Sequence, residues 1–362
     1  MIVARRPPTQ RGGRVRAARL TDLAAVGELS RLSHTEDRAA DARMRTLGLP
    51  LGSSHISVFS LFRLPLGALA PNDLLYVYEE RGKVGGLARV EHEGLRDEWT
   101  IVELDAVDNG TAGDIRFRLV QQALKDASKR GGMRFHVACA DEGGNVELFM
   151  QAGFARYGEE RILYRGPDDA QTQPATPAQP AESGIRPSVP LDALELDRLY
   201  RSATPGPVAR LEDYRLHDWE RQGSHWRVPR SSLTPLLRFA DVEGFVQQAR
   251  DGEAMLAFCQ IGVAKEEQPH YIRVVCRPDH DPTDLITHGL AVISERTHSR
   301  WAERARVARP DRGVVSAVRT YESPLDRRLE EAGFRQVANV SLLMKEMAER
   351  VSDPALVPLA TR

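Results

Sequence analysis

One segment of the chain, in which a helix ends and a strand begins, occurs twice. The first copy is Leu148–Arg165 and the second is Leu329–Lys345, and one constant offset in residue number carries Ala152-Gly153-Phe154 onto Ala332-Gly333-Phe334. A glycine directly after a helix takes the left-handed conformation that ends it, and the following phenylalanine is expected to pack beneath the helix end. A triplet that recurs together with its downstream strand indicates an internal duplication.

The duplication extends back toward the start of each copy, where the offset is slightly smaller. One offset superposes the opening strand Val15-Arg16 on Ile185-Arg186 and the helix cap Asp22 on Asp192. An offset larger by one residue superposes a later strand, Trp99–Val107, on His270–Pro278. The order of these landmarks predicts two copies of one fold in 362 residues, a length that is typical of roughly two domains.

A segment rich in proline, glutamine and alanine separates the two copies. It holds four prolines and no large apolar residue, so it cannot bury enough surface to order itself. We therefore predict a disordered arm at 1–13, an N-terminal domain at 14–166, the linker at 167–184, a C-terminal domain at 185–347 and a tail at 348–362.

Composition and charge exclude several classes of protein. The 50 basic and 51 acidic residues give a net charge of −1, which offers no electrostatic footprint for nucleic acid or an anionic membrane. No apolar stretch is long enough to span a bilayer, and the basic N-terminus lacks the apolar core of a secretory signal. Three cysteines without a metal or redox spacing fit a reducing environment, so a cytoplasmic location is expected.

Three pieces of the first half carry the resemblance to a known family. They are a strand–turn–strand hairpin over Tyr76–Val90, a strand, glycine-containing loop and long helix over Trp99–Arg130, and the Ala-Gly-Phe triplet followed by a strand. In this order they resemble the GNAT family, the N-acetyltransferases that use acetyl-coenzyme A (acetyl-CoA). The resemblance implies an α+β (mixed α/β) fold with two GNAT-like domains, each a mostly antiparallel central sheet flanked by helices.

The family places the pantetheine arm of acetyl-CoA in a gap between the fourth and fifth strands. It places the pyrophosphate on backbone N–H groups at the start of the long helix, where free donors and the helix dipole favour an anion. Carried onto this chain, the cofactor-binding positions are Ala106, Val107, Gly110, Thr111, Ala112, Gly113, Arg116 and Phe149.

The first half departs from the family at some of these positions. Val107 stands where the family has Gln or Arg, and Asp108 and Asp114 bring negative charge to the phosphate site, against which Arg116 could act. Phe149 stands where the family often has a tyrosine that protonates the departing thiolate.

The second half departs further. Its helix starts from Asp279–Asp284, which has no glycine and contains Pro282, a residue without an N–H donor. A capped structural helix start is the preferred interpretation there.

A general base must take a proton from the substrate amine, directly or through water. Glu103 and Asp105, in the fourth strand of the first half, are the predicted catalytic residues, with His136 as a further candidate. The alternative for Glu103 is an ordinary salt-bridged strand residue, and the alternative for His136 is a core histidine.

Two functions remain open from the sequence. In the first, the chain is an acyl-CoA-dependent N-acyltransferase acting on an amine of a small molecule or peptide, with acetyl-CoA held by the first copy and a structural second copy. In the second, the two copies form a catalytically degenerate pair that binds a ligand or a protein. Acetyl-CoA and an amine acceptor are the expected partners, without nucleic acid or membrane, and a homodimer is left open.

Overall fold

The computed structural model describes residues 13–22, 24–29, 73–93, 97–107, 110–141, 143–167, 184–221, 226, 228–249, 254–265, 268–298, 307 and 312–347. The predicted arm, linker and tail lie almost wholly outside these ranges, as does Asp108, so their bounds and those of the two domains stay predictions. No described helix is long and apolar enough to cross a membrane.

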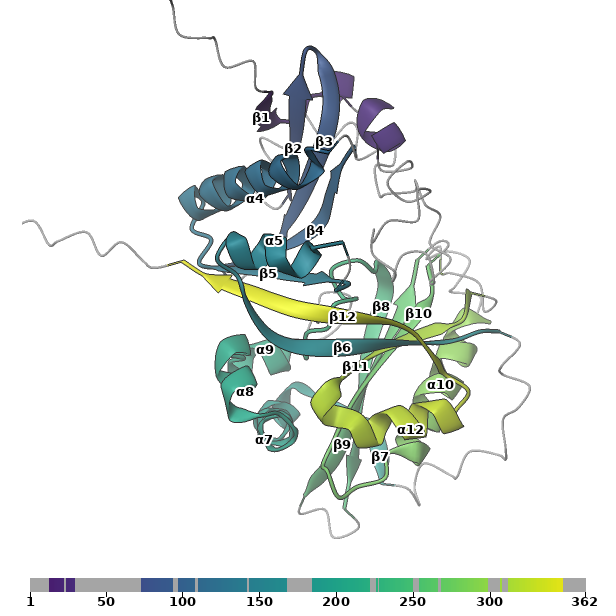
Figure 1. Cartoon of the computed structure of the whole chain (residues 1–362). Coiled ribbons are helices and arrows are strands. Elements are labelled where there is room, and N and C mark those ends of the chain that lie inside the picture. The colour runs from purple at the N-terminus through teal and green to yellow at the C-terminus, as the bar shows by residue number, and fades with distance from the viewer. Residues whose placement is uncertain are drawn as a thin grey trace, which may run out of the picture.

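The strands of both halves follow one order, drawn in Figure 1, with a long helix between the fourth and fifth strands of each half and a shorter helix between the fifth and sixth. The N-terminal half contains β1 (Arg14–Ala17), η1 (Leu20–Asp22), β2 (Asp73–Glu80), β3 (Lys83–His92), β4 (Glu98–Ala106), α4 (Ala112–Lys129), β5 (Arg134–Cys139), α5 (Asn145–Gln151) and β6 (Ala155–Arg165). The C-terminal half contains β7 (Ile185–Pro187), η3 (Pro190–Asp192), α7 (Ala193–Ala203), α8 (Gly206–Glu212), α9 (Leu216–Glu220), β8 (Phe239–Gln248), β9 (Met255–Ala264), β10 (His270–Cys276), α10 (Thr283–Thr297), β11 (Val314–Arg319), η6 (Thr320–Glu322), α12 (Ser323–Glu331) and β12 (Arg335–Glu346).

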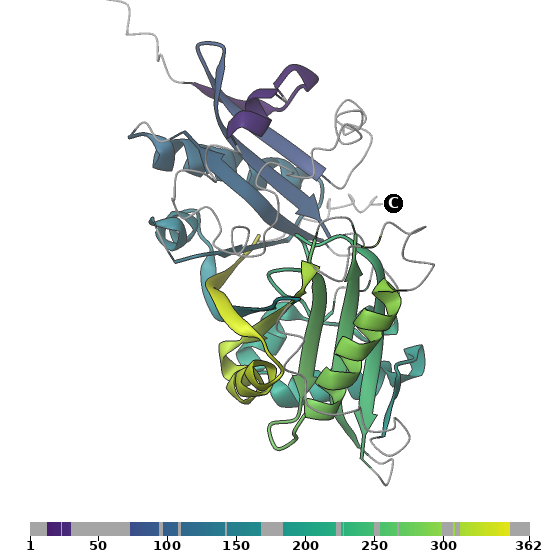
Figure 2. The same cartoon turned by 90° about the vertical axis from the view of Figure 1, so that its right-hand side faces the viewer.

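The strands of the two halves join into one 12-stranded sheet, in the order β1-β2-β3-β4-β5-β12-β6-β11-β10-β9-β8-β7. All neighbours are antiparallel except the pairs β4–β5 and β10–β11, which are parallel. Helix α4 covers β2, β3 and β4, and α10 covers the corresponding strands β8, β9 and β10 (Figure 2). The predicted fold class, mostly antiparallel sheets flanked by helices, is therefore confirmed.

The closing strands of the two halves are exchanged. Strand β12, from the C-terminal half, pairs with β5 of the N-terminal half, while β6 pairs with β11 of the C-terminal half. The two exchanged strands also pair with each other at the centre of the sheet. Each half therefore completes its sheet with a strand from the other half.

The repeated segment lies on the symmetry axis of this arrangement. Glu160 of β6 pairs with Val340 of β12, and the sequence offset that carries Gly153 onto Gly333 also carries Glu160 onto Val340. Two antiparallel strands that pair at equivalent residues are related by a two-fold axis at that point. The duplication is thus arranged around an approximate two-fold axis beside Glu160.

The opening strand of each half is held by the same ion pair. The Arg16 guanidinium donates to both oxygens of Asp22 at 2.6 and 2.9 Å, and Arg186 donates to both oxygens of Asp192 at 2.8 and 2.7 Å. Each aspartate also accepts the backbone N–H three residues before it, at 2.7 and 2.8 Å. These contacts confirm that the offset found for the opening strands relates equivalent positions.

The glycine that ends each repeated helix has the predicted conformation. Gly153 has φ +87° and Gly333 has φ +90°, in the left-handed region that favours glycine. Next to Gly153, Lys345 of β12 donates to the carbonyl of Ala152 at 2.5 Å, so a residue of the exchanged strand also caps the end of α5. Phe154 is buried beneath this helix end, as predicted.

The exchange predicts that the halves stay together without a covalent link. A protease site placed between Gly166 and Gly184 and then cleaved should leave both pieces in one peak on size-exclusion chromatography, because each piece keeps its strand in the sheet of the other. A fragment ending at Gly166, expressed alone, should aggregate or self-associate, because its β6 has lost both neighbouring strands and its β5 has lost one. A cooperative, monomeric fragment would contradict the exchange.

Candidate functional site

A β-bulge in β4 sets the direction of the predicted catalytic residues. Ile101 pairs with Val90 of β3 and Glu103 pairs with Arg89, so Val102 is the extra residue of the bulge. A bulge shifts the alternation of side chains by one residue. Before the bulge, Ile101 packs in the core under α4. After the bulge, Leu104 and Ala106 are the residues of β4 that pack there.

Glu103 and Asp105 consequently point to the face of the sheet away from α4. Glu103 is engaged there by the Nε of Arg89, 3.5 Å from its carboxylate. Asp105 is 7% exposed and pairs with Leu87, which belongs to the small core on that face. The structure thus places both predicted catalytic residues on one face of the sheet and gives Glu103 a salt bridge across the strands.

Strands β4 and β5 part beyond the bulge. Their parallel ladder runs only from Glu98 to Ile101 on β4 and from Arg134 to Val137 on β5, although β4 continues to Ala106. A strand edge that leaves its ladder presents backbone groups with which an extended ligand can pair. The separation lies beside the predicted residues Ala106 and Val107.

Helix α4 begins at the open end of this gap. The preceding Gly110 has φ +79°, and a side chain there would meet no atom within 4 Å. Thr111 is the N-cap but makes no side-chain capping bond. The first N–H groups of a helix have no partners within the helix, and here they include those of Ala112 and Gly113 at the start of an 18-residue helix.

Two arginines near this helix start have different roles. Arg118 forms an exposed salt bridge with Asp114 at 2.9 Å, which holds that carboxylate along the helix. Arg116 donates from Nη1 to the side chain of Asn145 at 2.8 Å. Burial lowers the pKa of the Arg116 guanidinium, although the nearby carboxylate of Asp105 acts in the opposite direction. Within the described part of the chain, its buried Nε has no hydrogen-bond partner.

Phe149 belongs to the core rather than to the gap. It is 4% exposed and packs edge-on against Phe154, with ring centroids 5.4 Å apart. Both rings lie in the apolar cluster under α4. Its predicted contact with the cofactor would therefore have to be indirect.

A small pocket opens on the face of the sheet away from α4, where β4 and β5 part. Its cavity volume is about 30 Å³, and we call it the splay pocket. The N-terminal half supplies Thr100–Val102, His136–Ala138 and Tyr157, and the C-terminal half supplies Arg230–Ser232, Pro235, Leu236, Arg319 and Leu342. Neither Glu103 nor Asp105 lines the splay pocket.

Two buried arginines form the wall that the C-terminal half contributes to the splay pocket. Arg230 donates to both oxygens of Glu93 at 2.6 Å and also binds Glu98. Arg319 binds Glu160 and Glu212, each at 2.7 Å. Arg319 also donates to the backbone oxygen of Arg230 at 3.1 Å, so the two arginines form one connected network across the halves.

Neither of these arginines was predicted from the sequence as a site residue. Arg319 ends the apolar strand Val314–Arg319, and the offset that relates the two glycine helix ends places it on Cys139. The sequence signal that could have singled out Arg319 is a charged residue in an otherwise largely apolar strand, without a charged counterpart in the other copy. The carboxylate partners of Arg319, Glu160 on β6 and Glu212 on α8, could not be found in that way, because they lie in two elements far from it in the sequence.

Tyr157 brings a hydroxyl to the splay pocket. Burial raises the pKa of this tyrosine to about 12, although the Arg319 guanidinium, 5.7 Å from the ring centroid, acts in the opposite direction. The phenol of Tyr157 is therefore protonated at neutral pH. His136 also lines the pocket, 5% exposed, with its Nε2 3.7 Å from a Glu98 oxygen.

The corresponding place in the C-terminal half is occupied by an ion pair. The ladder of β10 and β11 ends at Ile272. The next residue, Arg273, makes two hydrogen bonds of 2.8 Å to Glu322, which ends the short helix η6 that follows β11 in the sequence. By the offset that carries Trp99 onto His270, Arg273 stands where the N-terminal half has Val102. At the start of α10, Asp281 accepts the backbone N–H of Thr283 at 3.0 Å.

Comparisons with known proteins identify the fold. No protein-family model matches the sequence, and no curated protein matches it either. Among solved structures, the chain is similar to a GCN5-related N-acetyltransferase from Sphaerobacter thermophilus, with 15% identity, a TM-score of 0.53, and coverage of 93% of this chain and 96% of that one. It is also similar to a tandem GNAT protein from the clavulanic acid biosynthesis pathway, with 14% identity, a TM-score of 0.50, and coverage of 93% and 99%.

The buried network predicts a large loss of stability when one arginine is removed. Arg230→Met should lower the free energy of unfolding by about 3–5 kcal/mol, because it removes the guanidinium that binds both oxygens of Glu93 and that is the nearest cation to the buried carboxylate of Glu98. The matched control is Arg296→Met, which removes a two-bond pair with Glu243 at the surface and should cost less than about 1 kcal/mol. Equal midpoints in urea for the two variants would contradict the role given to Arg230.

Proposed function

The chain has the fold of tandem GNAT proteins, and from this fold and its site we propose that it is an acyl-CoA-dependent N-acyltransferase. In this proposal the N-terminal half holds the acyl-CoA, and the acceptor is an amine of a small molecule or peptide. The observation that carries it is the separation of β4 from β5 beyond Ile101, with the start of α4 at its open end. Acetyl-CoA would supply the acyl thioester.

The phosphate end of the ligand would lie at the start of α4. Gly110, Thr111, Ala112 and Gly113 offer a chain segment without large side chains, and the helix dipole favours an anion there. The buried Nε of Arg116 adds a donor beside this helix start. The pantetheine arm would pair with the β4 edge toward Ala106 and Val107.

The C-terminal half would shape the acceptor site instead of holding a donor molecule. Its Arg273–Glu322 pair occupies the place where its own strands part, and the carboxylate of Asp281 accepts the N–H of Thr283, the first residue of α10, where a phosphate would otherwise lie. Its segment around Arg230 and Ser231 instead closes over the N-terminal half. In this division of roles, the two halves together build a single working site.

The amine nitrogen would attack the thioester carbonyl carbon, and the carbon–sulfur bond would break. Tyr157 would protonate the departing thiolate, because it is the phenol that lines the splay pocket. The amine proton would pass to Glu103 or Asp105 through water, since neither carboxylate lines the pocket.

A second candidate function is a degenerate pair that binds a ligand or a protein without transferring an acyl group. The salt bridge of Glu103 with Arg89 and the small volume of the splay pocket favour it. Binding and turnover of acetyl-CoA, measured separately, distinguish the two candidates.

Calorimetry with acetyl-CoA should show one binding event per chain, and Gly110→Asp should abolish it by bringing a carboxylate and a strained backbone to the phosphate site. Gly82→Asp is a matched control, because Gly82 also has a left-handed φ, of +75°, and also has open space around it, but lies in the β2–β3 turn. Absence of heat with the unaltered chain, or equal loss in both variants, would reject the proposed donor site.

Tyr157→Phe should reduce release of free thiol from acetyl-CoA by about 10²-fold or more with any amine that supports turnover, which is the usual contribution of a general acid. Binding of acetyl-CoA should be unchanged, because the hydroxyl acts on the leaving group. Unchanged turnover would exclude Tyr157 as the acid, and binding without turnover in the unaltered chain would favour the second candidate function.

A further inference from the structure

The size of the splay pocket limits what it can hold. Its cavity volume of about 30 Å³ gives room for roughly two groups the size of a water molecule. The methyl group and the carbonyl oxygen of an acetyl group match this room, whereas each further methylene of a longer acyl group needs more. The acyl group that fits therefore depends on whether a wall of the pocket can give way.

The position of Tyr157 places the acyl group in this pocket. In the proposed reaction Tyr157 protonates the departing thiolate, so the sulfur lies beside the phenol. The acyl carbon is bonded to that sulfur. Because Tyr157 lines the splay pocket, the acyl group would lie there as well.

The lining suits an uncharged, apolar group. The guanidinium groups of Arg230 and Arg319 are already bound to carboxylates. The hydroxyl of Ser231 accepts a hydrogen bond from the hydroxyl of Tyr271 at 2.9 Å. Half of the lining side chains are apolar: Ile101, Val102, Val137, Ala138, Pro235, Leu236 and Leu342.

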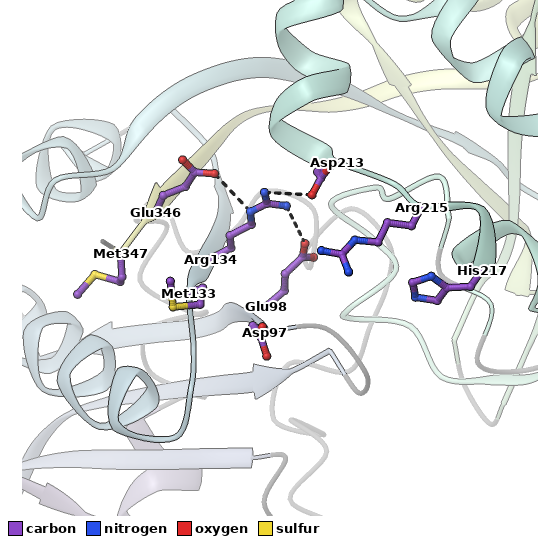
Figure 3. A pocket seen from close by; sticks show the side chains of 9 residues that line it. All are labelled: Asp97, Glu98, Met133, Arg134, Asp213, Arg215, His217, Glu346 and Met347. Carbon is purple, nitrogen blue, oxygen red and sulfur yellow. Dashed lines mark hydrogen bonds and ion pairs between the residues drawn. The ribbon is translucent and has the colours of Figure 1, made fainter. Parts of the chain in front are cut away.

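The pocket is closed toward the start of β4 and β5. A larger cavity of about 390 Å³ lies at that end of the two strands, and Figure 3 shows the residues around it. Arg230 lines the splay pocket and Glu98 lines the larger cavity, so the ion pair of these two buried side chains stands between them. Arg134 also lies 3.7 Å from Glu98 (Figure 3). Breaking a buried ion pair is costly, so a longer acyl group gains no room from the larger cavity.

The sheet side of the pocket is fixed by strand pairing. Ala138 of β5 pairs in register with Leu342 of β12, and both side chains line the pocket. Neither can withdraw without disturbing the backbone hydrogen bonds of the ladder. The other apolar wall, Pro235 and Leu236, comes from a segment of the C-terminal half that lies outside the strands.

Leu236 is the lining residue whose size can change at little cost to the core. Its neighbours Leu233 and Leu237 belong to a buried apolar cluster of the C-terminal half, whereas Leu236 is outside the clusters that the described residues form. Its backbone is held independently of its side chain. The N–H of Leu236 donates to the carbonyl of Leu233 at 2.9 Å, and its own carbonyl accepts from the side chain of Gln268 at 3.3 Å.

We propose that Leu236 of the C-terminal half is the specificity-determining residue that limits the acyl group of the donor to acetyl. The proposal rests on the proposed function, because it needs acyl-CoA to be held by the N-terminal half. In this arrangement the half without a donor site selects the donor of the other half.

Calorimetry on the full chain with CoA, acetyl-CoA, propionyl-CoA and butyryl-CoA tests this limit without an acceptor. In the unaltered chain, butyryl-CoA should bind about tenfold or more weakly than acetyl-CoA, because one methylene in an apolar pocket already discriminates about 10–200-fold. In Leu236→Ala, the space left by the side chain should bring butyryl-CoA to within about threefold of acetyl-CoA. Leu236→Val, a smaller change, should give an intermediate ratio.

A variant that fills the pocket tests the same point in the opposite direction. Ala138→Val adds methyl groups from the sheet side, so acetyl-CoA should lose any advantage over CoA. Leu290→Ala is the matched control, because Leu290 of α10 is 5% exposed, against 7% for Leu236, and packs in a separate apolar cluster. It should keep the ratio of the unaltered chain.

Two results would overturn the role of Leu236 and leave the donor site intact. They are equal affinities for acetyl-CoA and butyryl-CoA in the unaltered chain, and an unchanged ratio in both Leu236 variants. If neither CoA nor any of the thioesters binds, the donor site of the proposed function is itself rejected, and the role of Leu236 with it.

Discussion

The exchange of closing strands is the constraint on which the rest of the structure depends. Strand β6 has neighbours only from the other half, and β5 reaches the centre of the sheet through β12. The hydrogen bonds of these ladders are backbone bonds, and a strand edge left without them would be a site of aggregation. The two halves are therefore one cooperative sheet, although the linker between them suggests two independent domains. The repeated segment lies at this junction, which explains why it is the part of the duplication that is easiest to recognise.

Burial of charge follows from the exchange. Glu160 lies beside the two-fold axis and is fully buried, and its carboxylate binds Arg319 and accepts the backbone N–H of Ser232 at 2.7 Å. A buried charge is tolerated only with close partners. Those partners come from the C-terminal half, so the same contacts that satisfy Glu160 also position the segment that closes the splay pocket. The interface between the halves and the wall of the candidate site are in this respect one network.

Local features of the sequence predicted the parts of the fold that local physics determines. The Gly153 helix end, the hairpin turn at Gly82 and the long helix, predicted over Ile115–Arg130 and found over Ala112–Lys129, each depend on a few adjacent residues. The offset between the copies also related Arg16 and Asp22 to Arg186 and Asp192, which proved to be equivalent ion pairs. The exchange was not predictable in this way, because β6 and β12 both carry an apolar run at equivalent positions, Ile162–Tyr164 and Leu342–Met344, and either could close either sheet. The position of Glu103 was known, but its salt bridge and its distance from the pocket depend on the bulge at Val102.

The asymmetry of the two halves can be traced to a few residues around one carboxylate. Glu322 binds the Arg273 guanidinium and accepts the backbone N–H of Arg319 at 2.9 Å, so it connects the residue that occupies the C-terminal gap with a residue that lines the splay pocket. The loss of an open gap in one half is thus physically linked to the construction of the pocket in the other. A second copy that had only degenerated would not need these buried arginines, since replacing a buried ion pair by apolar residues is often neutral or stabilising. Their connection to Glu160, Glu212 and Arg230 instead makes the C-terminal half one wall of the splay pocket, whose other lining residues include Thr100 and Val102 of β4.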